Sequence, residues 1–347
     1  MTKSPSTEKK AKALKIAGEK VYPGERKRLS IDLATLYDYT QLAIPIEVIR
    51  GKEEGPIMFL SAAIHGDEIN GVEIIKKVLK KPVLSKLKGT LIAIPVVNVF
   101  GFNNKSRYLP DRRDLNRSFP GAKTGSLASR MAYFLMKEIV SQCTHGIDLH
   151  TAAINRNNLP QIRAALEDKE TQKLAESFGV PIIINSKLRD GSLREAARKR
   201  NVRTLLFEGG EALRFNEDVI KLGVRGCFSF MKQIGMLEVT SLTHSVATAP
   251  LRKSKIARGS YWVRAPHSGT FDLKKKLGDR VERNETIAVI TDTFGGDPYV
   301  VRADEKGLIV GLSTIPLVNQ GDAIAHIATF SSQLSSREAR FMLDEMI

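Results

Sequence analysis

Two of the six histidines in the chain stand where apolar runs of strand length end. His65 follows the run 56–64, with Glu68 three residues later, and His150 ends the run 146–149. Imidazole and carboxylate groups both bind zinc, and a set of two histidines and one glutamate leaves one coordination position open for water. The three residues together predict a catalytic zinc site, although burial in the core explains either histidine taken alone.

Two further carboxylates lie close to this candidate site. Asp148, two residues before His150, is expected to orient one of the two histidines, and the sequence does not say which. Glu208 follows the apolar run 204–207 and precedes two glycines. A carboxylate beside a metal ion can take a proton from water and pass it to a leaving amine. Glu208 is therefore a candidate general base, with an exposed strand-end glutamate as the alternative interpretation.

A polar loop over residues 107–121 has no helical period and carries four arginines: Arg107, Arg112, Arg113 and Arg117. The fork of an arginine binds a carboxylate through two hydrogen bonds, and Asn116 adds a neutral donor next to Arg117. The loop therefore predicts a carboxylate-binding segment. A solvated basic loop is the alternative interpretation.

The elements that must position these residues follow from the hydrophobic pattern. Apolar strands are predicted over 56–64, 90–97, 146–149, 181–185 and 202–207, and helices over 71–81, 126–141 and 216–235. Ser126 and Asn216 precede two of the helices as N-caps. Buried strands that alternate with amphipathic helices are typical of a mixed, mainly parallel sheet with helices on both faces. Ligands bind such sheets at the carboxyl ends of the strands, where His65, His150 and Glu208 are predicted to lie.

The pattern changes after a segment rich in Ser, Thr and Ala at 241–250, which is a predicted linker. Two related units over 265–290 and 303–328 each contain an Ala-x-x-x-Gly segment and then Gly-Asp before apolar residues. This pattern resembles the biotinyl/lipoyl-carrier fold, which implies a small all-β barrel-sandwich. The stretch 293–298 between the two units has no lysine, and this argues against a carrier function.

Composition limits the class of protein. The chain has 347 residues, of which 42% are hydrophobic, and 54 Lys and Arg against 38 Asp and Glu give a formal net charge of +16. The basic residues are dispersed without interleaved aromatics, so nucleic-acid binding is disfavoured relative to a solvated surface or attraction of small anions. Two cysteines exclude a disulfide framework, and no apolar run has the length of a membrane span or secretory signal. We expect a cytoplasmic protein with no membrane partner.

The predicted organisation has four parts: a basic, flexible N-terminal arm over 1–30, a zinc-dependent catalytic α/β domain over 31–245, the β-rich domain over 246–330, and a tail over 331–347.

The motifs together resemble the succinylglutamate desuccinylase/aspartoacylase family, a branch of the zinc carboxypeptidase-like hydrolases. In chain order they are His65–Glu68, Asp114–Arg117 with Phe119–Gly121, Asp148–Thr151 and Phe207–Gly209. The likeness covers about residues 40–330, including the appended β-rich domain. It implies that His65, Glu68 and His150 bind one zinc ion and that Glu208 acts first as base and then as acid.

The resemblance also assigns residues to the substrate. It implies that Asn116 and Arg117 hold a substrate carboxylate and that Arg107 polarises the reacting carbonyl. Arg112 and Arg113 stay open as substitutes for Arg107, and Arg163 is a further candidate for the pocket wall.

We therefore expect a zinc-dependent deacylase that hydrolyses the linear amide bond of an N-acylated amino acid or related small molecule. One alternative is a metallocarboxypeptidase acting on short peptides. Another is a non-catalytic protein that binds anions or nucleic acid and keeps a vestigial zinc site. The sequence names neither the acyl group nor the amine, and it leaves open whether the chain forms a homo-oligomer.

Overall fold

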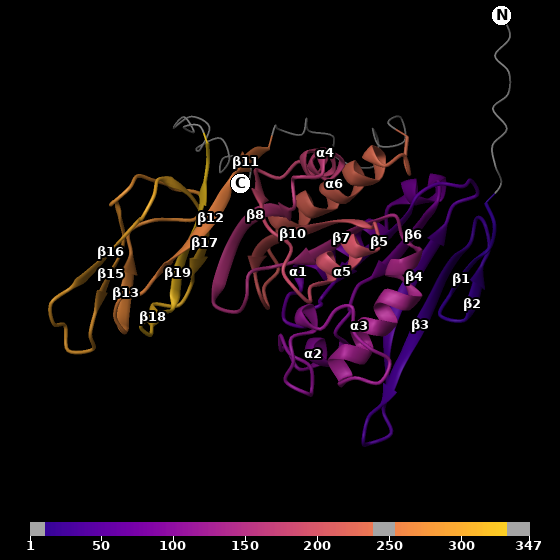
Figure 1. The fold of residues 1–347 in the computed structure, drawn as a ribbon, viewed down its shortest axis with the longest axis horizontal. Coiled ribbons are helices and arrows are strands. Elements are labelled where there is room, and N and C mark those ends of the chain that lie inside the picture. The colour runs from indigo at the N-terminus through magenta and orange to yellow at the C-terminus, as the bar shows by residue number, and fades with distance from the viewer. Residues whose placement is uncertain (1–10, 239–253, 332–347) are drawn as a thin grey trace, which may run out of the picture.

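The structure, a computed structural model of the chain, describes residues 11–238 and 254–331 (Figure 1). Its largest element is a mixed sheet of 13 strands. These strands are β3 (Arg26–Thr35), β4 (Gln41–Arg50), β5 (Ile57–Ala62), β6 (Thr90–Ile94), β7 (His145–His150), β8 (Arg156–Ala164), β9 (Ile182–Asn185), β10 (Arg203–Glu211), β11 (Lys255–Ala257), β12 (Gly259–Arg264), β14 (Arg280–Val281), β17 (Gly307–Ser313) and β19 (Ala323–Thr329). The main path runs β12-β19-β17-β8-β10-β7-β5-β6-β4-β3, and β9, β11 and β14 pair beside it.

The centre of this sheet is parallel. Strands β6, β5, β7 and β10 are parallel neighbours in that order. Antiparallel strands extend the sheet on both sides, β4 and β3 beyond β6, and β8 and β17 beyond β10. The carboxyl ends of β5, β7 and β10 therefore meet at one edge of the sheet, which is where ligands bind in folds of this class.

Helices cover both faces of the central sheet (Figure 1). They are α1 (Asn70–Leu79), α2 (Val99–Asn103), α3 (Leu127–Glu138), α4 (Lys169–Phe178), α5 (Leu193–Lys199) and α6 (Glu217–Gln233), with short 3₁₀ helices η1 (Pro82–Lys86), η2 (Leu115–Arg117) and η3 (Val140–Gln142). Side chains of α1, α4 and α6 share one buried core, and those of α3 and α5 share the other. The predicted α/β fold with a helix-flanked mixed sheet is confirmed.

Strand β5 shows why the central runs are almost continuously apolar. Met58 and Leu60 contribute to the core on one face, whereas Phe59 contributes to the core on the other. Successive side chains of a strand point to opposite faces, so a strand covered on both sides needs apolar residues at every position. The predicted N-caps are also confirmed, because the side chains of Ser126 and Asn216 each accept a hydrogen bond from a backbone amide in the first helical turn.

The C-terminal part of the chain forms a small antiparallel β module. Its four-stranded sheet consists of β13 (Gly269–Leu273), β15 (Thr286–Thr291), β16 (Tyr299–Arg302) and β18 (Leu317–Val318). This sheet encloses a separate hydrophobic core together with β12, β17 and β19. Strand β17 also pairs with β8, so the main sheet continues from the α/β part of the chain into this module.

The prediction of a flexible arm over residues 1–30 is wrong for residues 11–30. Strands β1 (Leu14–Ile16) and β2 (Glu19–Val21) form a two-stranded sheet, and β3 begins at Arg26. Ile16 and Val21 are fully buried, and the guanidinium of Arg50 donates hydrogen bonds to the Lys12 carbonyl. Burial of apolar side chains and satisfied polar groups hold this segment in place despite its many lysines.

Several boundaries fall outside the described residues. These are residues 1–10 of the predicted arm, the linker at 241–250 with the domain boundary at 245/246, and residues 332–347 of the predicted tail. Within the described residues, no helix is long and apolar enough to cross a membrane.

Candidate metal and active site

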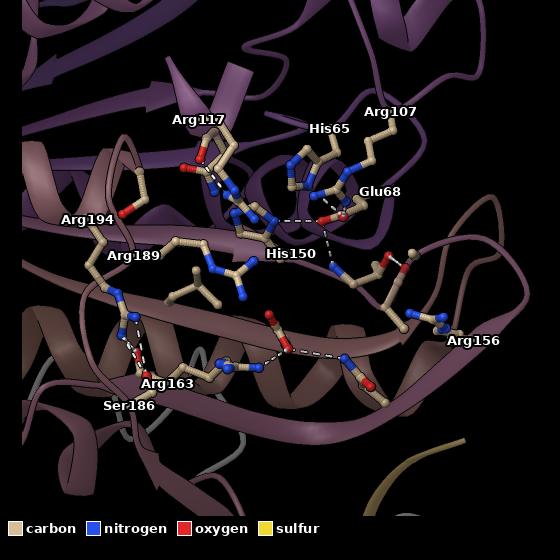
Figure 2. A pocket seen from close by; sticks show the side chains of 18 of the residues that line it. His65, Glu68, Arg107, Arg117, His150, Arg156, Arg163, Ser186, Arg189 and Arg194 are labelled. Atoms are coloured by element: carbon tan, nitrogen blue, oxygen red, sulfur yellow. Dashed lines mark hydrogen bonds and ion pairs between the residues drawn. The ribbon is translucent and has the colours of Figure 1, made fainter. Parts of the chain in front are cut away.

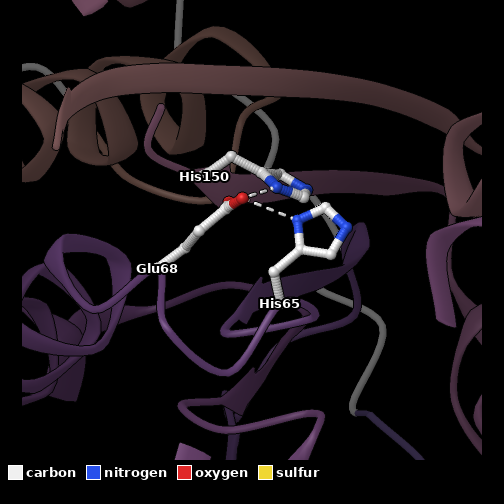
Figure 3. A group of neighbouring side chains, drawn as sticks. All are labelled: His65, Glu68 and His150. Carbon is white, nitrogen blue, oxygen red and sulfur yellow. Dashed lines mark hydrogen bonds and ion pairs between the residues drawn. The ribbon is translucent and has the colours of Figure 1, made fainter. Parts of the chain in front are cut away.

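Three buried side chains meet at the carboxyl edge of the central sheet (Figure 3). His65 and Glu68 lie in the turn between β5 and α1, and His150 is the last residue of β7. Nδ1 of His65 lies 2.7 Å from Glu68 Oε1, and Nδ1 of His150 lies 2.7 Å from Glu68 Oε2. Candidate ligand atoms of the three residues all lie within 4.8 Å of one another. The structure thus brings together the set predicted from sequence as a metal site.

The turn that carries His65 and Glu68 packs directly against α2. A Cβ atom on Gly66 would lie 1.9 Å from the carbonyl carbon of Gly101, a distance that no side chain can adopt. Glycine at position 66 therefore lets the turn approach α2 closely enough to hold the two flanking ligand residues.

Each histidine is held from behind by a carboxylate. Nε2 of His65 lies 3.1 Å from Asp114 Oδ1, and Nε2 of His150 lies 2.8 Å from Asp148 Oδ2. A proton on Nε2 that is donated to a carboxylate leaves the Nδ1 lone pair for a metal, which is the usual arrangement around histidine ligands. The donor set and its supporting carboxylates therefore fit a zinc ion. Asp148 orients His150. Asp114 orients His65 in the same way, and the sequence did not predict this contact.

The charges of the triad are strongly coupled. Burial opposes ionisation of Glu68, but the two histidines outweigh it and lower the pKa of its carboxyl far below the usual range. Burial also opposes protonation of His150, yet Asp148 and Glu68 raise its pKa well above the ordinary value. A metal ion must displace these protons when it binds, so its affinity depends on pH.

Arg107 is the arginine of the loop that reaches this centre. Its Nη1 lies 3.2 Å from Glu68 Oε1, and its Nη2 lies 2.9 Å from Asp114 Oδ2. Arg112 and Arg113 are exposed and do not line the cavity. The geometry thus favours Arg107 over its two predicted substitutes.

Glu208 stands beside His150 on the neighbouring strand. The two residues are register partners in the parallel pair β7–β10. Glu208 Oε2 accepts hydrogen bonds from the side-chain amides of Asn158 at 3.1 Å and Gln161 at 3.2 Å, and Arg163 Nη1 lies 3.7 Å away. All three of these neighbours lie on β8, a strand that the apolar pattern does not predict.

Asn116 and Arg117 lie in η2, close to the triad. The side-chain oxygen of Asn116 accepts a hydrogen bond from the backbone amide of Leu193 at 2.9 Å, which ties the arginine-rich loop to α5. Partial burial, together with the neighbouring Arg189 and Arg107, lowers the pKa of Arg117. Arg107, Arg117 and Arg189 line the same cavity, and this concentration of positive charge favours a bound anion.

All eight predicted site residues line one cavity of about 450 Å³ (Figure 2). Sequence reasoning missed other parts of its wall, which are Asn158 on β8, Arg156, Lys187, Arg189 and Arg194, and three residues of the C-terminal module, Trp262, Arg264 and Ala323. Arg189 and Arg194 precede Glu208 without any motif, and only the rarity of Trp262, the single tryptophan of the chain, distinguishes it in the sequence.

Comparison with known proteins identifies the family of this chain. The family model for the succinylglutamate desuccinylase/aspartoacylase catalytic domain matches residues 54–234, just over half of the chain. The chain belongs to this family. The resemblance predicted from the sequence is confirmed, and with the buried His65, Glu68 and His150 it makes the protein a hydrolase of non-peptide carbon–nitrogen bonds, acting on N-acyl amino acid-like compounds.

Individual relatives agree in length and fold. The chain is 28% identical over 298 residues to N-alpha-acetyl-L-2,4-diaminobutyric acid deacetylase of Halomonas elongata, which covers 82% of this chain and 85% of that protein. The crystal structure of a succinylglutamate desuccinylase/aspartoacylase from Rhodobacter sphaeroides matches with a TM-score of 0.77 and 25% identity, over 87% of this chain and 95% of that one. The product-bound ectoine utilization protein EutE (DoeB) from Ruegeria pomeroyi matches with a TM-score of 0.78 and 23% identity, over 88% and 95%, and supports the fold.

Proposed function

We propose that this protein is a zinc-dependent deacylase that binds one zinc ion per chain and hydrolyses N-acyl amino acids with a free α-carboxylate. The observation that carries this proposal is the position of Glu208, which lies next to His150 on the adjacent strand and lines the same cavity as the triad. The name of the Halomonas elongata relative, a deacetylase of an N-acetyl amino acid, supports the same substrate class.

His65, Glu68 and His150 would hold the zinc ion. When bound, zinc polarises a carbonyl oxygen and lowers the pKa of water. Glu208 takes the proton of the attacking water and then gives it to the departing nitrogen. Its Oε2 is held by Asn158 and Gln161, whereas within the described residues no donor is bonded to Oε1, so Oε1 is the atom that carries the proton.

Arg107 and Arg117 take different parts of the substrate in this proposal. The Arg107 guanidinium stands beside the triad, where it stabilises the negative charge that develops on the carbonyl oxygen. Arg117, with Asn116, binds the α-carboxylate of the amino acid through charge-assisted hydrogen bonds. The Nη1 atom of Arg163 lies 3.7 Å from Glu208 Oε2, so the role of Arg163 in this proposal is to hold the base.

The shape of the cavity supports a small substrate over a peptide. Trp262 and Arg264 of the C-terminal module form part of its wall, so an extended chain has less room than in an open groove. This observation disfavours the metallocarboxypeptidase alternative. A cytoplasmic location and the lack of nucleic-acid binding remain predictions from the sequence.

The Glu208→Gln variant tests the proposal with a panel of N-acyl amino acids. We expect it to keep zinc and substrate binding while kcat falls by about 10²–10⁴, the usual size of general acid–base catalysis. Glu211→Gln is the matched control, because Glu211 lies on the same strand, accepts a hydrogen bond from Thr314 and does not line the cavity. Near-normal kcat in Glu208→Gln would place the base elsewhere.

Elemental analysis tests the metal. We expect about one zinc per chain in the normal protein and a strongly reduced content in His150→Ala, because one of three ligands is lost. Full occupancy in that variant would contradict the assignment of the triad.

A further inference from the structure

Two side-chain amides of β8 hold Glu208 by a single oxygen. Asn158 Nδ2 and Gln161 Nε2 both donate to Glu208 Oε2, at 3.1 and 3.2 Å, and both residues are buried. A catalytic group works only when its supporting residues fix its geometry closely. If Glu208 is the base, as in the proposed function on which this inference rests, the direction of its other oxygen depends on where these two amides lie.

A bulge in β8 brings both amides to the same face of the sheet. Gln161 pairs with Glu208 and Asn158 pairs with Gly210, so three steps along β8 match two steps along β10. Residues three apart in a regular strand point to opposite faces, and the extra residue of a bulge brings them to one face. Pro160 lies between the two amides, and a bulge is a place where a strand tolerates proline.

The C-terminal module reaches Asn158 through β17. Strand β8 lies between β10 and β17 (Figure 1), and Gly311 of β17 is the register partner of Asn158. A Cβ atom on Gly311 would lie 2.7 Å from Asn158 Oδ1, closer than side chains approach one another. Glycine at position 311 therefore leaves the space that the Asn158 amide occupies.

The opposite side of Gly311 is closed by His326. This histidine is the register partner of Gly311 on β19, and a Cβ atom on Gly311 would lie 3.1 Å from its Cβ. His326 is buried, and its ring stacks on Trp262 with ring centres 4.3 Å apart and ring planes 8° apart. Because His326 is packed in this way, a side chain at position 311 would displace the Asn158 amide.

We propose that Asn158 and Gly311 are positioning residues for Glu208. Gly311 of the C-terminal module sets the place of the Asn158 amide, and this amide, with Gln161, fixes Oε2 of the base. Oε1 is then held in one direction for the attacking water. The C-terminal module thus contributes to the reaction through the orientation of the base, although Gly311 itself does not line the cavity.

The test compares Asn158→Ala, Gly311→Ala and the double variant on the N-acyl amino acid that the normal protein hydrolyses best. Each single variant should lose about 10- to 100-fold in kcat and equally in kcat/KM, because a misplaced base weakens only the transition state. KM and zinc content should stay the same. The double variant should lose no more than the stronger single variant, because Gly311 acts through Asn158.

A second glycine of the module provides the control. Gly259→Ala adds the same methyl group on β12, where the new Cβ would meet only Thr329 Oγ1, at 3.9 Å, and it should keep kcat.

Unfolding in urea gives a measurement that does not depend on turnover. Gly311→Ala should be less stable than the normal protein because of the crowding, and adding Asn158→Ala should restore part of the loss. If Gly311→Ala alone does not fold, the double variant decides, since it lacks the crowded amide. Its kcat should then equal that of Asn158→Ala.

Four outcomes would overturn the proposal and leave the deacylase assignment intact. They are a normal kcat in either folded single variant, a raised KM with unchanged kcat, a double variant whose kcat lies well below that of Asn158→Ala and of any folded Gly311→Ala, and a double variant that does not fold. If the normal protein hydrolyses no N-acyl amino acid, the proposed function falls and this inference falls with it.

Discussion

Asp148→Asn removes one buried negative charge next to His150 and keeps the size of the side chain. Asp148 is 1% exposed, and its two oxygens bond to His150 Nε2 and to the Ser61 hydroxyl, each at 2.8 Å. The asparagine oxygen can still accept the proton of His150, and its NH₂ group can donate to Ser61, because a hydroxyl also accepts hydrogen bonds. The variant therefore isolates the effect of the charge on metal binding.

The expected loss follows from the position of Asp148 directly behind a metal ligand. Replacing such a partner typically lowers metal affinity 10- to 100-fold, and this corresponds to about 1.4–2.7 kcal/mol. We expect Asp148→Asn to lose zinc affinity within this range at pH 8, while the fold measured by circular dichroism stays unchanged.

The pH dependence of this loss has a definite sign. Although burial opposes it, the carboxylates of Asp148 and Glu68 raise the pKa of His150 well above its ordinary value, and zinc must displace that proton. Zinc affinity of the normal protein therefore rises with pH until the raised pKa is passed. Without the charge of Asp148 the pKa of His150 is lower, so protons compete less and the affinity loss is smaller at low pH than at high pH.

Competition with a chromogenic chelator at several pH values measures these affinities. The control is Asp218→Asn, which removes a carboxylate of α6 that pairs with Lys221 and lies away from the cavity. It should leave zinc affinity unchanged. Unaltered affinity in Asp148→Asn at pH 8 would refute the reasoning, because it would mean that the charge behind His150 does not act on the metal.

Three further outcomes can be checked independently. Arg117→Ala should weaken the binding of substrates with a free α-carboxylate by about 2–5 kcal/mol. Amidating the substrate carboxylate should lower kcat/KM in the normal protein but lower it little further in the variant, so that the two losses are not additive. Gly146→Ala should lower the free energy of unfolding in urea by about 1–3 kcal/mol, because its new Cβ would lie 2.2 Å from the Phe59 ring; unchanged stability would contradict this. Burial raises the pKa of the Cys143 and Cys227 thiols, so iodoacetamide should label both only after denaturation, and rapid native labelling would be inconsistent with their burial.

The metal ligands were predictable because their signal is local. His65 and Glu68 are separated by three residues in one strand-to-helix turn, and the end of an apolar run places each histidine at the carboxyl edge. Parallel strands buried on both faces have to be apolar throughout, so a polar residue at their end stands out. The sequence by itself therefore determined the α/β class and the residues of the triad.

The residues that hold the metal ligands and Glu208 in place come from segments far apart in the chain. Asp114 meets His65 across 49 residues, and Asn158 meets Glu208 across 50. Strand β8 is polar at Asn157, Asn158 and Gln161, so no apolar run marks it. It is specified by pairing with β10 and β17 rather than by its own pattern.

The strands of the N-terminal segment could not be predicted from its composition. Its basic composition indicated a solvated arm, yet β3 alternates buried Ile31 and Leu33 with exposed residues, and Arg26 and Arg28 both bind Glu47 on β4. Charged side chains are common on edge strands because they prevent pairing with other chains. Composition cannot separate such a strand from a solvated arm, since only the tertiary structure provides the neighbouring strand that pairs with its backbone and the carboxylate that binds its arginines.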